Sequence, residues 1–312
     1  MSSDLATAQR EVAELKLDLL HFPDIGMNAF TYFLAYARMA PVQTVGWGHP
    51  DTTGIDTVDY FLSFDTAEPA DAADHYSETL VRLSRPSVCY APDETITQKL
   101  PRAAFGLPES GALYGCLQSM FKFHPDFDAV AADVLRRDPA GWIVLVDWTS
   151  PAWTRQLRAR WERSHPILLE RVIIAPRQPL DRFRHLVANM DVMIDPVHFG
   201  GGNTFYEALA QNVPAVTWPG HYLRGRLITG FYKLLGVEEG LLAATPADIA
   251  PMAVALVKDP AHRAKVCAPL FAKGHTLYRD PVAPRELGAF FEAAVKADLE
   301  GKKITDWRYR PS

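Results

Sequence analysis

The hydrophobic and polar positions follow two different periods along the chain, and these periods predict alternating strands and helices. Short apolar runs between turn residues predict buried strands at residues 17–22, 42–47, 59–64, 79–83, 113–117, 142–146, 171–175, 192–195 and 215–218. Apolar positions at helical spacing predict helices at residues 3–15, 26–38, 126–137, 152–164, 179–189, 204–211, 246–258, 260–273 and 283–299. From residue 111 onward the alternation is regular, which is typical of a doubly wound parallel sheet with helices on its faces.

The stretch 91–108 breaks this alternation, because it holds three prolines and little periodicity. We therefore expect an N-terminal lobe over residues 1–95, a linker over 96–110, and a C-terminal lobe over 111–280. Residues 281–312 form a final helix and tail, for which packing back onto the N-terminal lobe is one option.

Composition and charge narrow the class of protein. Hydrophobic residues make up 48% of the 312 positions and charged residues 22%, which is ordinary for a folded domain. The net charge of −5 argues against a nucleic-acid partner. The three cysteines are widely spaced, so we expect no metal site and a reducing, cytoplasmic location. The sequence has no secretory signal and no run of the ~18 apolar residues that a membrane span needs.

The most informative segment follows the strand 192–195 and runs through three consecutive glycines, Gly200, Gly201 and Gly202. Glycine lets the backbone approach a bound anion closely, and Asn203 and Thr204 are expected to cap the next helix. The N–H groups at a helix start form an anion site, and Glu207 one turn later can accept hydrogen bonds from ribose hydroxyls. The alternative is a flexible turn with Glu207 in solvent. The pattern lacks the spacing of a hydride-transfer dinucleotide site or a Walker P-loop.

These residues also carry a resemblance to a known family. Gly-Gly-Asn-Thr-Phe-Tyr-Glu-Ala-Leu-Ala (201–210), Val-Pro-Ala-Val-Thr-Trp-Pro-Gly (213–220) and Arg-Gly-Arg (224–226) resemble the C-terminal lobe of glycosyltransferase family 41. That family holds O-linked N-acetylglucosamine transferases, SPINDLY-like proteins and bacterial N-glycosyltransferases. Further matching segments lie at residues 39–43, 48–54, 75–83 and 121–125, and the resemblance covers about residues 15–275.

The resemblance implies an α/β, GT-B-like fold, in which two Rossmann-like lobes enclose a sugar nucleotide. It begins partway into the family's N-terminal lobe, so we expect a truncated lobe here. The tetratricopeptide repeats of many relatives are not expected.

The resemblance also implies roles for individual residues. Lys122 would neutralise the leaving diphosphate, and His49 would face the sugar or acceptor and act as general base, with Asp51 and Asp56 as alternatives. Glu207 would stand where the family has an aspartate at the ribose. The remaining nucleotide-binding residues implied or expected are Ser119, Ala175, Arg177, Arg182, Gly201, Gly202, Asn203 and Thr204.

The function implied is transfer of a sugar from a UDP-sugar donor to a protein or small-molecule acceptor, with inversion and without a metal or other cofactor. Two alternatives remain. The first is a non-catalytic protein that only binds a UDP-sugar, and the second is a sugar-nucleotide epimerase or hydrolase of GT-B fold. The identity of the acceptor and the formation of a homodimer are left open.

Overall fold

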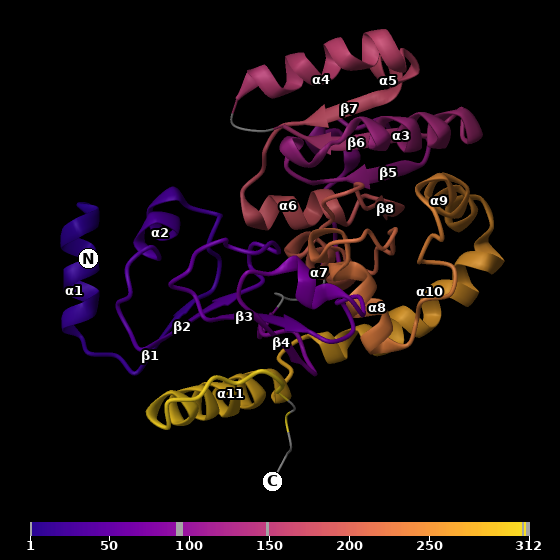
Figure 1. Ribbon diagram of the computed structural model, residues 1–312. Helices are drawn as coiled ribbons and strands as arrows, with labels where there is room; N and C mark the ends of the chain where they lie inside the picture. Colours follow the sequence, from indigo (N-terminus) through magenta and orange to yellow (C-terminus); the bar gives the residue numbers. More distant parts are fainter. Residues whose placement is uncertain (1, 92–95, 148–149, 308, 310–312) are drawn as a thin grey trace. The chain divides into compact units, whose positions relative to one another are not determined.

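The computed structural model describes residues 2–91, 96–147, 150–307 and 309 (Figure 1). The chain divides into two compact units. The first unit combines Met1–Tyr90 with His221–Arg224 and Arg279–Ser312, and the second combines Ala91–Gly220 with Gly225–Tyr278. Each unit is described by itself below.

The first unit contains a four-stranded parallel sheet in the sequential order β1-β2-β3-β4. Its elements are α1 (Leu5–Glu14), β1 (Leu19–Phe22), α2 (Ala29–Leu34), β2 (Val42–Gly46), β3 (Tyr60–Phe64), the single turn η1 (Ala72–His75), β4 (Thr79–Leu83) and α11 (Val282–Leu299). β2 and β3 are buried along their whole length, as continuous apolar runs in parallel sheets are.

The C-terminal helix α11 belongs to this first unit. Phe290 and Ala294 on α11 pack against Val42, Tyr60 and Leu62 of the sheet. The Tyr60 and Phe290 rings meet edge to face with centroids 5.4 Å apart. A segment more than two hundred residues away in sequence therefore completes the core of this sheet. Apolar burial of this kind stabilises the fold by about 25 cal/mol per Å².

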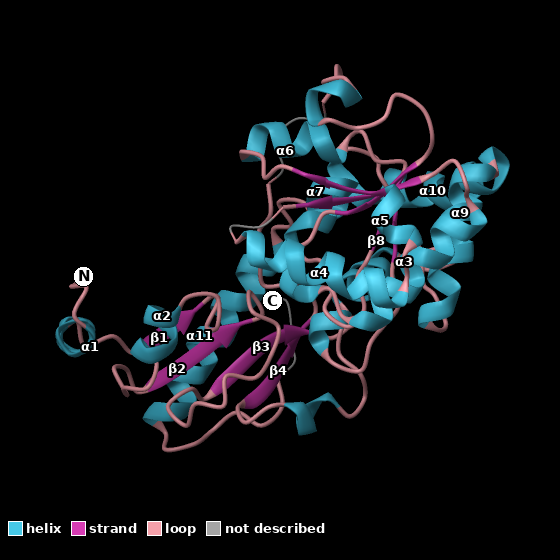
Figure 2. Ribbon diagram, turned by 90° about the horizontal axis from the view of Figure 1, so that it is seen from above, coloured by secondary structure: helices cyan, strands magenta, loops and turns pink. Residues whose placement is uncertain are grey.

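The second unit holds a five-stranded parallel sheet in the order β7-β6-β5-β8-β9, with helices on either side of it (Figure 2). Its strands are β5 (Leu113–Cys116), β6 (Trp142–Val146), β7 (Val172–Ala175), β8 (Val192–Ile194) and β9 (Ala215–Val216). Its helices are α3 (Pro125–Arg137), α4 (Pro151–Ser164), α5 (Ile167–Arg171), α6 (Leu180–Val187), α7 (Asn203–Ala210), α8 (Leu227–Leu235), α9 (Ile249–Lys258) and α10 (Pro260–Gly274). Short 3₁₀ turns lie at η2 (Arg102–Phe105), η3 (Met120–Lys122), η5 (Pro246–Asp248) and η6 (His275–Leu277).

The strand order of the second sheet reverses between β5 and β8, which are hydrogen-bonded neighbours. The chain moves outward from β5 through β6 to β7, then returns to β8 on the other side of β5. In open α/β sheets, ligands bind beyond the carboxyl ends of the strands at this switch point. The loops that follow β5 and β8 are therefore the first place to examine for a site.

The predicted strands and helices agree with the structure to within a few residues at most positions, with three differences. The helix expected at 26–38 is only α2, which Asn28 begins by accepting the Phe30 N–H at 2.7 Å. The short helix α5 was not predicted. The helix α8, in which seven of nine residues are buried, was also not predicted.

The proline-rich stretch expected as a linker packs onto the second unit. The Leu100 N–H donates to Nδ1 of His185 at 3.1 Å, and the Leu100 carbonyl accepts from the Asn189 side chain at 2.9 Å. Residue 95, the predicted lobe boundary, lies outside the described residues. None of the described helices is long and apolar enough to cross a membrane.

Candidate functional site

The glycine loop after β8 is organised by a buried carboxylate, Asp195. Its Oδ1 accepts the backbone N–H of Gly201 at 2.7 Å, and its Oδ2 accepts the hydroxyl of Thr217 at 2.7 Å. Asp195 is only 6% exposed. Because Asp195 directly follows β8, its hydrogen bonds hold the glycine loop in a fixed position relative to the sheet.

Two of the three glycines are required by close packing. A Cβ atom on Gly200 would lie 2.4 Å from Oδ2 of Asp195, and one on Gly201 would lie 2.7 Å from Nε2 of Gln118. Real Cβ atoms do not approach other atoms this closely. The glycines therefore allow the loop to lie directly on Asp195 and Gln118.

The loop runs into α7, whose start differs from the sequence expectation. Gly202 is the N-cap and Asn203 is already the first helical residue, so Asn203 and Thr204 do not cap the helix with their side chains. In the described part of the chain, the backbone N–H groups of Gly202, Asn203 and Thr204 have no protein acceptor. These donors are the uncapped start of a helix, which carries a partial positive charge and suits a phosphate.

Lys122, which ends η3 after β5, reaches across the switch point to the same loop. Its Nζ donates to the Gly200 carbonyl at 2.8 Å and to Oε1 of Gln118 at 3.0 Å, and it lies 4.4 Å from the centre of the Phe199 ring. An ammonium group has three N–H donors, so one remains for a ligand. The structure thus brings together the predicted residue Lys122 and the predicted glycine loop.

Burial shifts the pKa values of Asp195 and Lys122. Burial raises the pKa of Asp195 to about 6, although hydrogen bonds from Thr217 and Gly201 and the charge of Lys122 oppose the rise. Burial also lowers the pKa of Lys122, opposed by the charge of Asp195. Both shifts mean that the charged forms are poorly solvated here. A diphosphate beside Lys122 would favour its charged form.

A cavity of about 290 Å³ lies at the carboxyl ends of the neighbouring strands. It is lined by Leu117, Gln118, Ser119, Val146, Asp147, Arg177, Gln178, Leu180 and Phe183. Ser119 and Arg177, both predicted to bind the nucleotide, are among these residues. Ala175, at the end of β7, accepts the Asp147 N–H at 2.8 Å through its carbonyl, so it supports this wall. The volume and position suit a small organic group next to the phosphate donors.

Glu207 and Arg182 are placed differently from the other predicted residues. The Glu207 carboxylate, on α7, is 5% exposed and forms an ion pair with Nε of Arg184 at 3.0 Å. Arg182 donates to Gln178 at 3.0 Å and lies over the Phe105 ring of η2 at 5.3 Å. Neither residue lines the cavity, so their contacts with a nucleotide stay predictions.

His49 lies in the first unit, in the loop that follows β2. Its ring packs on Gly26, where an added Cβ would lie 2.5 Å from Cδ2 of the ring. Its Nε2 lies 4.0 Å from Oδ2 of Asp51, and Asp51 also pairs with Arg224 at 2.8 Å. An imidazole can take a proton from an attacking group, and the role of His49 as general base stays a prediction.

Asp195 and Gln118 are site residues that were not predicted from the sequence. The signal for Asp195 was present, because a carboxylate at the carboxyl end of a buried strand leads directly into the glycine run. Gln118 had no such signal, since its contact with Gly201 depends on the pairing of β5 with β8.

The chain is similar in sequence to proteins named as glycosyltransferases. No protein-family model matches the chain. The chain is 26% identical over 285 residues to a UDP-glucose:protein N-beta-glucosyltransferase of Actinobacillus pleuropneumoniae, covering 90% of this chain and 45% of that protein. It is 27% identical over 230 residues to a probable UDP-N-acetylglucosamine–peptide N-acetylglucosaminyltransferase SPINDLY of Solanum lycopersicum, covering 71% and 24%. The chain therefore spans less than half the length of these relatives.

Solved structures show the same fold. An O-GlcNAc transferase mutant from Thermobaculum terrenum superimposes with a TM-score of 0.79 at 22% identity, over 96% of this chain and 57% of that one. The Anabaena protein HepE, solved with UDP and glucose, has a TM-score of 0.61 at 13% identity, over 93% and 81%. The expectation of a GT-B-like α/β fold with parallel sheets is confirmed.

Proposed function

We propose that this chain, a relative of the family 41 glycosyltransferases, binds a UDP-sugar in its second unit and takes part in transferring the sugar to an acceptor. The observation that carries the proposal is the meeting of Lys122 with the glycine loop at the switch point of the sheet. The unpaired N–H groups at the start of α7 and the adjacent cavity provide places for a diphosphate and a uridine. Sequence relatives named for UDP-sugar donors support this choice of nucleotide.

The chemistry follows from where charge develops. As the bond from the sugar to the diphosphate breaks, negative charge grows on the leaving UDP. Fixed donors aimed at that charge lower the barrier, because they need no reorganisation during the reaction. Lys122 and the start of α7 are such donors, so we propose that transfer proceeds without a metal ion.

The acceptor must lose a proton as it attacks the sugar. We propose that His49 takes this proton, with Asp51 stabilising the imidazolium that forms. Attack on the face opposite the leaving UDP inverts the anomeric carbon. The acceptor that we propose is a protein, since the named relatives act on proteins or peptides.

The first experiment measures binding. Titration calorimetry with UDP should show one site per chain, and UDP at a hundredfold excess over its Kd should stabilise the folded protein by about 2.7 kcal/mol. UDP-glucose and UDP-N-acetylglucosamine are then compared as donors with a panel of acceptor peptides, and glycosylated product is detected by mass spectrometry.

The outcomes separate the three functions considered. Sugar transferred to peptide supports the proposal, and loss of transfer with retained UDP binding in His49→Ala supports the role of His49. UDP binding without any turnover would indicate a binding protein. Free sugar or an isomerised donor would indicate hydrolysis or epimerisation. Absence of UDP binding would overturn the proposed site itself.

A further inference from the structure

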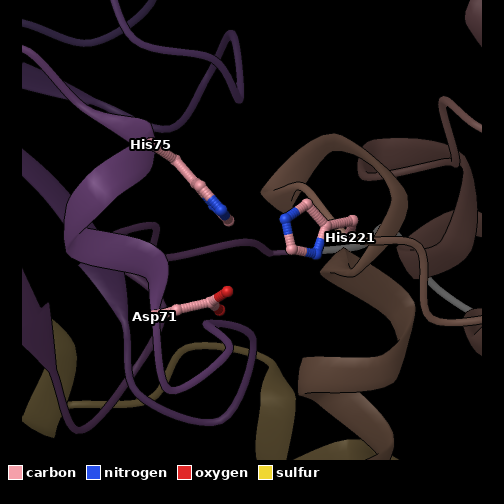
Figure 3. Close-up of side chains that lie close together, drawn as sticks. All are labelled: Asp71, His75 and His221. Carbon is pink, nitrogen blue, oxygen red and sulfur yellow. The ribbon is translucent and has the colours of Figure 1, made fainter.

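A second cluster of polar side chains lies in the first unit, apart from the nucleotide-binding residues. It consists of Asp71, His75 and His221, and Figure 3 shows the three side chains converging on one point. One carboxylate oxygen and one ring nitrogen from each histidine all lie within 4.8 Å of one another. We propose that this cluster binds a divalent transition-metal ion, and that zinc fits it best.

The local fold presents two of the three ligands together. Asp71 precedes η1 and His75 ends it, so one helical turn places both side chains on the same side (Figure 3). The Asp71 carboxylate makes no capping hydrogen bond to η1. It is therefore available to a ligand, in contrast to most carboxylates at helix starts.

His75 supplies the second observation that points to a ligand. Its Nδ1 is buried and has no hydrogen-bond partner among the described residues. A buried ring nitrogen without a partner costs free energy, and a metal ion bound at that nitrogen would remove this cost. The His75 and His221 rings meet edge to face at 62° with centroids 4.7 Å apart.

The third ligand is held in place by its neighbours in the chain. Tyr222 packs against both histidine rings, with centroids 4.9 Å from each. Arg224 lies over the Tyr222 ring at 4.9 Å and pairs with Asp51 at 2.8 Å. The segment His221–Arg224 is thus fastened to the first unit by groups other than the proposed metal, which pre-organises His221.

The donor set selects the class of metal. Two imidazole nitrogens and one carboxylate oxygen suit zinc and its transition-metal neighbours, whereas calcium and magnesium prefer oxygen ligands alone. Tetrahedral zinc with bonds of about 2.0–2.1 Å keeps its ligand atoms about 3.3 Å apart, which small side-chain rotations can reach from this arrangement. Three protein ligands leave a fourth position for water.

Another cluster of histidines and a carboxylate, in the second unit, provides a matched comparison. His124, Asp126 and His198 also lie close together, but Nε2 of His198 is already 2.8 Å from Oδ2 of Asp126, and His124 caps α3 by accepting the Asp126 N–H. All three donors are occupied within the protein. This cluster therefore serves as the control, because it tests whether histidines that lie close to a carboxylate are enough to bind zinc.

The test uses the full chain after treatment with a chelator. Zinc chloride titrated by calorimetry should bind with one equivalent per chain, and the melting temperature should rise with zinc concentration. Cobalt chloride should produce visible absorption bands of a protein-bound ion. His75→Gln and His221→Gln should each weaken zinc binding by at least about tenfold, and Asp71→Asn should weaken it as well.

The double variant His124→Gln with His198→Gln should bind zinc as the unaltered protein does. Melting curves without zinc identify any variant that fails to fold. Asp71→Asn and His221→Gln replace exposed residues and are therefore the variants least prone to misfolding. The proposal is overturned if the chelated protein takes up no zinc, if His221→Gln binds it unchanged, or if the control double variant loses it. UDP binding is measured in parallel, so failure here is distinguished from failure of the nucleotide site.

Discussion

The ammonium group of Lys122 lies 2.8 Å from the carbonyl oxygen of Gly200, which joins the loop after β5 to the loop after β8. These residues are separated by 78 positions in the sequence. Their contact combines a positive charge with a helix start whose backbone N–H groups are unpaired, at the edge of the sheet where α/β proteins bind ligands.

Replacing Lys122 by methionine should weaken UDP binding by about ten- to a hundredfold. The variant loses a charge-assisted hydrogen bond to the diphosphate, which contributes about 1.5–3 kcal/mol. Calorimetry with UDP measures the change. Lys265→Met is the control, because Lys265 is 73% exposed and pairs with Glu239, which is also exposed. Equal affinities in the two variants would contradict the role given to Lys122.

Gly200→Ala should reduce both stability and UDP affinity. The new methyl group would meet Asp195 at 2.4 Å, so either the loop or the carboxylate must move, at a cost of about 1–3 kcal/mol. Urea denaturation and UDP titration measure the two effects. Gly288→Ala in α11 is the matched control, because nothing lies within 4 Å of its Cβ position. Alanine is also the better helix former, so this control should be neutral or slightly stabilising.

Asp195→Asn should change how stability depends on pH. Because the pKa of Asp195 is raised from 3.8 to about 6, the folded protein holds this proton between about pH 4 and 6 while the unfolded chain has lost it. The free energy of unfolding of the unaltered protein should therefore fall as pH rises through this window, by up to about 3 kcal/mol relative to the asparagine variant. Urea denaturation of both proteins at several pH values gives the difference, and a difference constant with pH would refute the raised pKa.

Glu207 has a structural partner as well as a predicted ligand, and two variants separate these roles. Glu207→Gln leaves Arg184 with its charge in a site only 13% exposed, so it should lower stability by about 3 kcal/mol. The double variant Arg184→Leu with Glu207→Leu should recover most of that loss, since the charged arginine is removed together with the carboxylate that it contacts.

UDP affinity in the double variant then decides the role of Glu207. If Glu207 binds the ribose, the refolded double variant should bind UDP at least about tenfold more weakly. If its affinity equals that of the unaltered protein, Glu207 serves only the ion pair with Arg184. Arg184→Leu alone, measured in the same titration, shows whether the arginine contributes to binding by itself.

The sequence by itself determined the local structure of this protein. Short apolar runs predicted the strands of both sheets, and apolar positions at helical spacing predicted most helices. The glycine run between Asp195 and Asn203, together with Lys122, was enough to indicate an anion site. The family resemblance rested on these same positions and is confirmed by the matching relatives.

Only the tertiary structure decided which distant residues meet. The contact of Gln118 with the glycine loop, the pairing of Arg184 with Glu207, and the convergence of His221 on Asp71 and His75 each join separate parts of the chain. Packing also placed α11 in the core of the first unit and buried seven of the nine residues of α8. Such contacts depend on how the chain folds back on itself, and the spacing of neighbouring residues does not determine that.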